Sequence, residues 1–130
     1  CLSLISMEIG FQKRKGLELM YQIFVYVPDT HLDAVKSAMF SVGAGRLGDY
    51  EHCAWQTQGQ GQFRPMAGSQ PFIGEQGKAE VVDEYRVEML CLRDSLEAVV
   101  QALRSAHPYE EPAFGVIALD SAVTASSDAR

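Results

Sequence analysis

The segment HPYEEP gathers side chains that do chemistry in many proteins. The imidazole of His107 and the carboxylates of Glu110 and Glu111 could transfer protons or hold a divalent metal ion, and Tyr109 adds a hydroxyl. A structural interpretation is also open, because a residue before Pro108 avoids helical geometry, so the segment would form a rigid corner after a helix. In extended backbone the two glutamates point in opposite directions, so at most one of them would join His107.

The segment DYEHCAW, residues 49–55, carries a second histidine beside a cysteine. In a strand His52 and Cys53 face opposite sides of the sheet, so they would not bind one metal ion together. His52 could meet His107 or Glu110 where strands approach across subunits, and such a set suits zinc or copper. A divalent-metal site of these three residues is therefore one hypothesis. A hydrogen-bonded His52 and a buried Cys53 are the alternative.

Residues 58–78, QGQGQFRPMAGSQPFIGEQGK, read as a long loop rich in glycine. Loops of this length inside a domain are usually functional, although a flap at a subunit interface would also explain this one. Its glycines match neither GxxxxGK[ST] nor a complete GxGxxG motif. Arg64 is the cation of the loop that could bind a small anionic ligand. Phe63, Phe72 and Ile73 are expected to anchor the loop.

An internal repeat indicates the elements that position these segments. Residues 21–39 align without a gap with residues 85–103, so that Tyr21 matches Tyr85 at an offset of 64. Each copy reads as a strand, a turn and a helix. A ferredoxin-like α+β sandwich of order βαββαβ follows, with an antiparallel sheet and two helices on one face. The remaining strands are expected at 50–57 and 113–119.

Helix ends and the uncovered sheet face can also be predicted. Thr30 with Asp33, and Asp94 with Glu97, resemble capping boxes, and Gly43 would end the first helix. Large side chains at alternate strand positions would lie on the face without helices, which predicts an oligomer. The alternative is that the 58–78 loop covers this face. The residues concerned are Phe24, Tyr26, Trp55, Leu90 and Leu92.

Composition excludes several classes of function. A chain of 130 residues suffices for one domain, and its net charge of −6 argues against binding nucleic acid, which depends on Lys and Arg. No apolar run is long enough to cross a bilayer, which argues against a membrane protein. The three cysteines lack CxxC spacing, so we expect a reducing, cytoplasmic compartment. We interpret 1–19 as a leader or artificial extension, 20–119 as one domain and 120–130 as a flexible tail.

One long pattern resembles a known family. The string GxGxFRPxxGxxPFIGxxGK, starting at Gly59, closely resembles the PII-like insert domain of the Nif-three-like (YqfO-type) dinuclear-metal proteins. HPYEEP is similar to a segment of the CutA family, a trimeric ferredoxin-like group. Residues 1–130 show no counterpart of the family's larger metal-binding domain, so we expect neither dinuclear chemistry nor a GTP cyclohydrolase activity to carry over.

The resemblance implies a stand-alone PII-like or CutA-like module that forms a homotrimer and binds a small anionic ligand or a regulatory protein partner. We expect no catalysis. The alternatives are a divalent-metal-binding protein, or a hydrolase that works through a bound metal; any cofactor is otherwise unknown. The predicted ligand-binding residues are Tyr50, His52, Arg64, Phe72, Gly74, His107, Tyr109 and Glu110; the metal hypothesis uses His52, His107 and Glu110.

Overall fold

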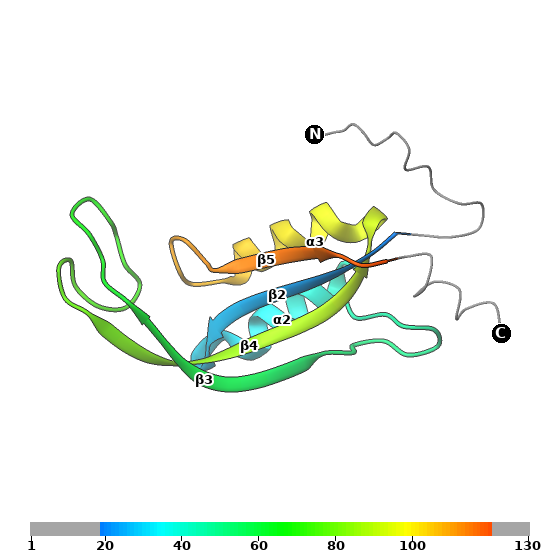
Figure 1. Cartoon of the computed structure of the whole chain (residues 1–130), viewed down its shortest axis with the longest axis horizontal. Helices are drawn as coiled ribbons and strands as arrows, with labels where there is room; N and C mark the ends of the chain where they lie inside the picture. Colours follow the sequence, from blue (N-terminus) through cyan, green and yellow to red (C-terminus); the bar gives the residue numbers. More distant parts are fainter. Residues whose placement is uncertain (1–18, 121–130) are drawn as a thin grey trace.

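The computed structural model describes residues 19–120, which form an antiparallel sheet with two helices on one face (Figure 1). The strand order is β3-β4-β2-β5, which confirms the predicted ferredoxin-like βαββαβ fold. The leader and tail expected at the two ends lie outside the described residues, apart from Leu19 and Asp120. The elements are β2 (Met20–Pro28), the short 3-10 helix η1 (Asp29–His31), α2 (Leu32–Ser41), β3 (Trp55–Phe63), β4 (Glu80–Leu92), α3 (Arg93–Ala106) and β5 (Phe114–Ala118).

The core lies between the sheet and the two helices. Alternate residues of β2 and β4 point toward the helices, and Val25 stands opposite Val87 in the antiparallel register. Val35 and Met39 of α2 and Leu103 of α3 are fully buried against them. The alternation predicted from both halves of the repeat therefore builds one continuous core.

The first helix ends as predicted, whereas neither predicted capping box forms. Gly43 has a φ of 111°, and the Ala44 N–H donates to the Met39 carbonyl at 3.1 Å, which closes the helix in the Schellman manner. Thr30 bonds to the imidazole of His31 instead of capping α2. The backbone of α3 continues directly from β4, which places Asp94 inside the first turn rather than before it. Both capping-box predictions are therefore wrong.

The second predicted strand is shifted along the chain. Residues 50–54 are outside the strand, which begins at Trp55 and continues to Phe63 through residues predicted as loop. The backbone of His52 has a φ of 59°, which is incompatible with a strand. Backbone pairing of β3 with β4, from Trp55↔Glu88 to Phe63↔Glu80, extends this strand instead. The connecting loop therefore covers only 64–79.

The sheet face away from the helices carries aromatic and charged side chains. The guanidinium of Arg86 lies 4.2 Å from the ring centroid of Phe24 and donates to the Tyr26 hydroxyl at 2.6 Å. Arg86 also pairs with Glu88 at 3.1 Å, and Trp55 is 67% exposed. No helix within residues 19–120 is long and apolar enough to cross a membrane. The register confirms the residues predicted for this face, namely Phe24, Tyr26, Trp55, Leu90 and Leu92.

The core packing predicts a large difference between two leucines. Leu103→Ala would open a cavity at a fully buried position, whereas Leu47 is 49% exposed. We expect Leu103→Ala to lower the free energy of unfolding by about 2–5 kcal/mol. The matched change Leu47→Ala should cost less than about 1 kcal/mol. Urea denaturation followed by circular dichroism measures both, and equal effects would contradict the described core.

Candidate functional site

A cavity of about 680 Å³ lies at one end of the uncovered sheet face, between the 64–79 loop and the HPYEEP corner. In Figure 1 this end is on the left, where the β3–β4 connection curls beyond the sheet. Tyr26 of β2, Phe63 of β3 and Glu84 of β4 contribute from the sheet. The loop contributes Arg64, Pro65, Met66, Ala67, Ser69, Pro71, Phe72 and Ile73, and the corner contributes Tyr109, Glu110, Glu111 and Ala113.

The 64–79 loop is anchored at both its base and its tip. The Gly77 N–H donates to the Pro65 carbonyl at 2.6 Å, which closes the base. The Gln70 N–H donates to Oε1 of Glu110 at 2.9 Å and so attaches the tip to the corner. The ring of Phe72 packs edge-on against His31, with centroids 5.4 Å apart. The predicted anchoring of the loop by Phe72 is therefore confirmed. The loop, which forms one wall of the cavity, is also hydrogen-bonded to the corner that forms the other wall.

Tyr109 is the aromatic centre of the cavity. Its ring lies 6.1 Å from that of Phe63 and 6.4 Å from that of Phe72. Its hydroxyl donates to Oε2 of Glu84 at 3.0 Å. Burial and the neighbouring Glu84 carboxylate raise the pKa of Tyr109 well above its ordinary value, so the phenol stays a neutral donor. The corner therefore presents a fixed aromatic face.

His107 holds the corner against the sheet. The buried imidazole bonds through Nε2 to the Tyr26 carbonyl at 2.7 Å, and its Nδ1 accepts the Tyr109 N–H at 3.2 Å. This pairing requires the neutral tautomer with the proton on Nε2. Burial lowers the pKa of His107, with a smaller contribution from His31. Both ring nitrogens are used, so His107 positions Tyr109 from behind and does not line the cavity.

The charges around the cavity are mainly negative. Arg64 is the one basic residue of the lining, against Glu84, Glu110 and Glu111. The extended backbone assumed for Glu110 and Glu111 does not form, because residues 109–111 make a bend, and both glutamates line the cavity. Sequence reasoning missed Tyr26, Glu84 and Glu111 as lining residues. The register Pro28↔Glu84 brings Glu84 to this end, and such long-range pairing leaves no local signal in the sequence.

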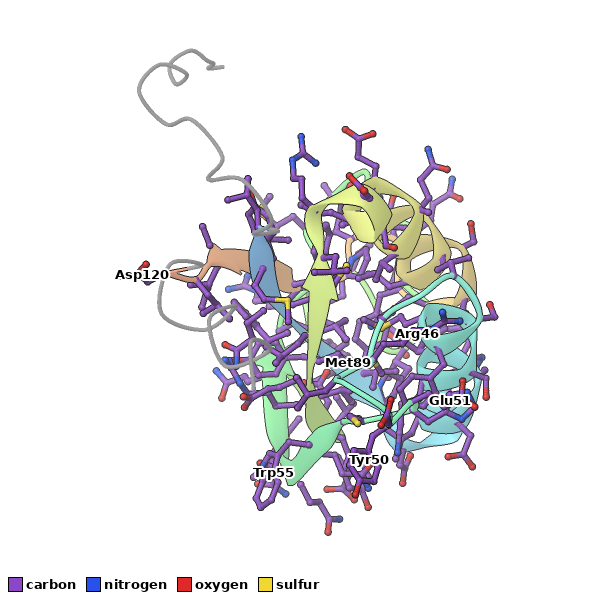
Figure 2. The ribbon with its side chains drawn as sticks, turned by 90° about the vertical axis from the view of Figure 1, so that its right-hand side faces the viewer. Arg46, Tyr50, Glu51, Trp55, Met89 and Asp120 are labelled. Carbon is purple, nitrogen blue, oxygen red and sulfur yellow. The ribbon has the colours of Figure 1, made fainter. Side chains whose placement is uncertain are left out.

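Besides His107, three predicted site residues lie outside this cavity. Tyr50 is 75% exposed at the end of the molecule that faces the viewer in Figure 2, opposite the 64–79 loop. His52 stacks on Phe40 with ring centroids 4.6 Å apart. Gly74 has a φ of 91° and lies under the side chain of Glu80, so it shapes the loop without facing the cavity. Predicted residues that do line the cavity are Arg64, Phe72, Tyr109 and Glu110.

The residues of the metal hypothesis are not brought together within one chain. Among residues 19–120, no three His, Cys, Asp or Glu side chains are grouped so that they could hold a metal ion. His52 contacts α2, whereas His107 is bonded to β2 and the corner. Because the nitrogens of His107 already bond to Tyr26 and Tyr109, a metal ion would have to displace one of these bonds.

A second, smaller cavity of about 360 Å³ lies near the end that carries Tyr50. Its lining includes Cys53 together with Arg46, Trp55 and Met89, which Figure 2 labels. Cys53 is a free, half-buried thiol.

The bonding of His107 predicts a pH dependence of stability. The pKa of His107 is lowered in the folded chain from its ordinary value of 6.5, so the unfolded chain takes up the proton first as the pH falls. We expect full stability above about pH 6.5 and a loss of up to about 1.4 kcal/mol per pH unit below it from this group. Urea denaturation at a series of pH values measures the slope.

Two histidine variants separate this effect from other titrations. His107→Gln should remove this contribution to the slope, while His52→Gln, at the other end of the molecule, should leave it in place. An unchanged slope in His107→Gln would contradict the role given to the buried imidazole.

No family model matches the chain, but individual proteins do. A curated relative from Mycobacterium leprae, named GTP cyclohydrolase 1 type 2 homolog, is 48% identical over 88% of this chain. The match covers 30% of that relative. A relative of the same name from Bacillus subtilis is 41% identical over 73% of this chain and 26% of its own length. The chain thus spans less than a third of the curated relatives it matches.

Solved structures agree with these matches. A Bacillus cereus protein related to NIF3 aligns with a TM-score of 0.69 and 38% identity, over 80% of this chain and 26% of its own. The periplasmic divalent cation tolerance protein CutA of Archaeoglobus fulgidus aligns with a TM-score of 0.57 and 13% identity, over 84% and 92%. GlnK of Bacillus subtilis aligns with a TM-score of 0.54 and 10% identity, over 78% and 86%. The last two matches show the fold alone. This chain therefore has the fold of CutA and GlnK and is related by sequence to one segment of the Nif-three-like proteins.

Proposed function

We propose that this chain is a small-molecule-binding regulatory module, cytoplasmic and not itself catalytic, that assembles as a homotrimer. The observation that carries the proposal is the cavity beneath the 64–79 loop. Its volume of about 680 Å³ lies in the usual range for small-molecule sites. Apolar walls with a few polar groups at fixed positions are also typical of such sites.

The side chains of the cavity favour binding over catalysis. The Ser69 hydroxyl donates to the Met66 carbonyl rather than to a base. Glu84 and Glu110 accept bonds that hold Tyr109 and the loop in place. Nucleophilic catalysis requires a nucleophile within hydrogen-bond reach of a base. Tyr109 and Glu84 form such a contact in the lining, but burial and the Glu84 carboxylate raise the pKa of the phenol, which keeps it protonated and a poor nucleophile.

The activity that the relatives are named for belongs to proteins much longer than this chain. The GTP cyclohydrolase name belongs to proteins of which the chain spans less than a third. The name of the Archaeoglobus fulgidus protein mentions a divalent cation. Residues 19–120 of this chain contain no group of three His, Cys, Asp or Glu side chains that could bind one. Within residues 19–120 of one chain, no ligand group supports the metal-binding alternative or the hydrolase that would depend on it.

Self-association is supported by the uncovered face of the sheet. Trp55, at 67% exposure, and Ile117, at 44%, lie on the two edge strands β3 and β5. An exposed apolar face flanked by unpaired strand edges is a usual site of subunit contact. A trimer would bury both the face and the edges.

The trimer predicts that two exposed aromatic residues respond differently to substitution. Trp55→Glu places a charge on the uncovered face, whereas Tyr50→Glu changes an exposed side chain on the loop outside the sheet. We expect trimers for the unchanged chain and for Tyr50→Glu, and smaller species for Trp55→Glu. Light scattering coupled to size-exclusion chromatography measures the mass. A monomeric unchanged chain would overturn the proposed assembly.

Ligand binding can be tested without knowing the ligand. Uncharged, cationic and anionic aromatic fragments would be screened against 15N-labelled chain by NMR. We expect amide shifts to cluster in residues 64–79 and 107–113 for at least one fragment. Ala113→Trp, which fills the cavity, should abolish these shifts, and Ala98→Trp on the exposed side of α3 should preserve them. Absence of shifts there for every fragment would contradict the proposal.

A further inference from the structure

The chemistry of the cavity walls bears on which ligand the proposed site accepts. The rings of Phe63 and Phe72 both lie near that of Tyr109, with centroids 6.1 and 6.4 Å from its own. Aromatic rings grouped in this way attract cations through their negatively charged faces. The same sheet already uses this interaction, because the guanidinium of Arg86 lies 4.2 Å from the ring centroid of Phe24 and 5.4 Å from that of Tyr26.

The carboxylates around the cavity are not neutralised by the protein. Within residues 19–120, the ion pairs are Lys78 with Glu75 and Arg86 with Glu88, so none of the three glutamates of the lining forms one. Within the described residues, Glu84 accepts a hydrogen bond from Tyr109 and Glu110 accepts one from the Gln70 N–H, whereas an ionised carboxylate can accept about four. Negative charge and free acceptor positions therefore surround an apolar cavity.

Arg64 does not reverse this balance. It is the one basic side chain of the lining, it is exposed, and it forms no ion pair with the glutamates. An anionic ligand would gain one favourable charge contact and meet three unfavourable ones. A cationic ligand would meet three favourable charges and one unfavourable charge, and it would also contact the aromatic rings.

We propose that the cavity binds a small organic cation, an ammonium or guanidinium group carried on an apolar or aromatic body. The inference rests on the proposed ligand-binding function and names the ligand class for that site. The apolar body would lie in the cavity against Phe63, Phe72 and Tyr109. The cationic group would face Glu110 and Glu111, where each N–H donor finds a carboxylate acceptor. The anionic ligand expected from Arg64 is replaced by one of opposite charge.

Three probes of nearly equal size isolate the effect of charge. Phenethylamine is a cation at neutral pH, 2-phenylethanol is uncharged, and 3-phenylpropionate is an anion. Dissociation constants would be measured from NMR shifts of the 15N-labelled full chain at low and high salt. We expect phenethylamine to bind about tenfold more tightly than the alcohol, and the anion to bind most weakly. High salt should reduce the preference.

Variants assign the preference to named side chains. Glu110→Gln with Glu111→Gln should remove most of the advantage of the cation, and Arg64→Gln should increase it. Glu97→Gln, a surface change on α3 that removes one carboxylate charge away from the cavity, is the control and should have no effect. Unaltered affinities in the double variant would overturn the role given to these carboxylates.

The outcomes separate this inference from the proposed function. Equal binding of the three probes at the cavity would overturn the charge preference while the cavity remains a ligand site. Tighter binding of 3-phenylpropionate would overturn it as well and would identify Arg64 as the dominant group. Absence of binding by all three probes at millimolar concentration would count against both proposals.

Discussion

The corner and the cavity depend on one buried imidazole. In an antiparallel strand the N–H and C=O of a residue point to the same side. The N–H of Tyr26 bonds to the Ala113 carbonyl at 3.0 Å, so its own carbonyl also points toward the β5 side, just beyond the end of that strand. His107 supplies the missing donor at 2.7 Å. The end of α3 is thereby fixed to β2, and the adjoining Tyr109 is held by the second ring nitrogen.

The opposite wall of the cavity is built by backbone pairing. β3 has little hydrophobic pattern, and most of its side chains are exposed. Its nine residues nevertheless pair continuously with β4, which carries the 64–79 loop beyond the body of the sheet. Gly61 contributes by lacking a side chain, because a Cβ there would clash with the carboxylate of Glu84. The Glu84 side chain can therefore lie against β3 and accept a hydrogen bond from the Tyr109 hydroxyl.

The two walls meet through a small number of polar contacts. The loop is bonded to the corner by the hydrogen bond between Gln70 and Glu110. The sheet is bonded to the corner by the hydrogen bond between Glu84 and Tyr109. These contacts use part of the hydrogen-bonding capacity of each glutamate and leave their charges unpaired. The site thus combines a well-defined shape with an uncompensated negative potential. The segment that matches this chain makes up 30% of the Mycobacterium leprae relative and 26% of the Bacillus cereus chain.

The sequence by itself determined the fold, because alternation in β2 and β4 and the repeated strand–helix unit are local patterns set by the geometry of each element. It also determined the end of α2 at Gly43, where a residue without a side chain is needed. Tertiary structure alone decided where β3 begins and which residues share the cavity. Tyr26, Glu84 and Tyr109 are brought together by strand register and by a hydrogen bond across 81 positions. Such contacts depend on pairing partners far along the chain. The local sequence therefore could not indicate that Tyr50 and His52 lie away from the cavity.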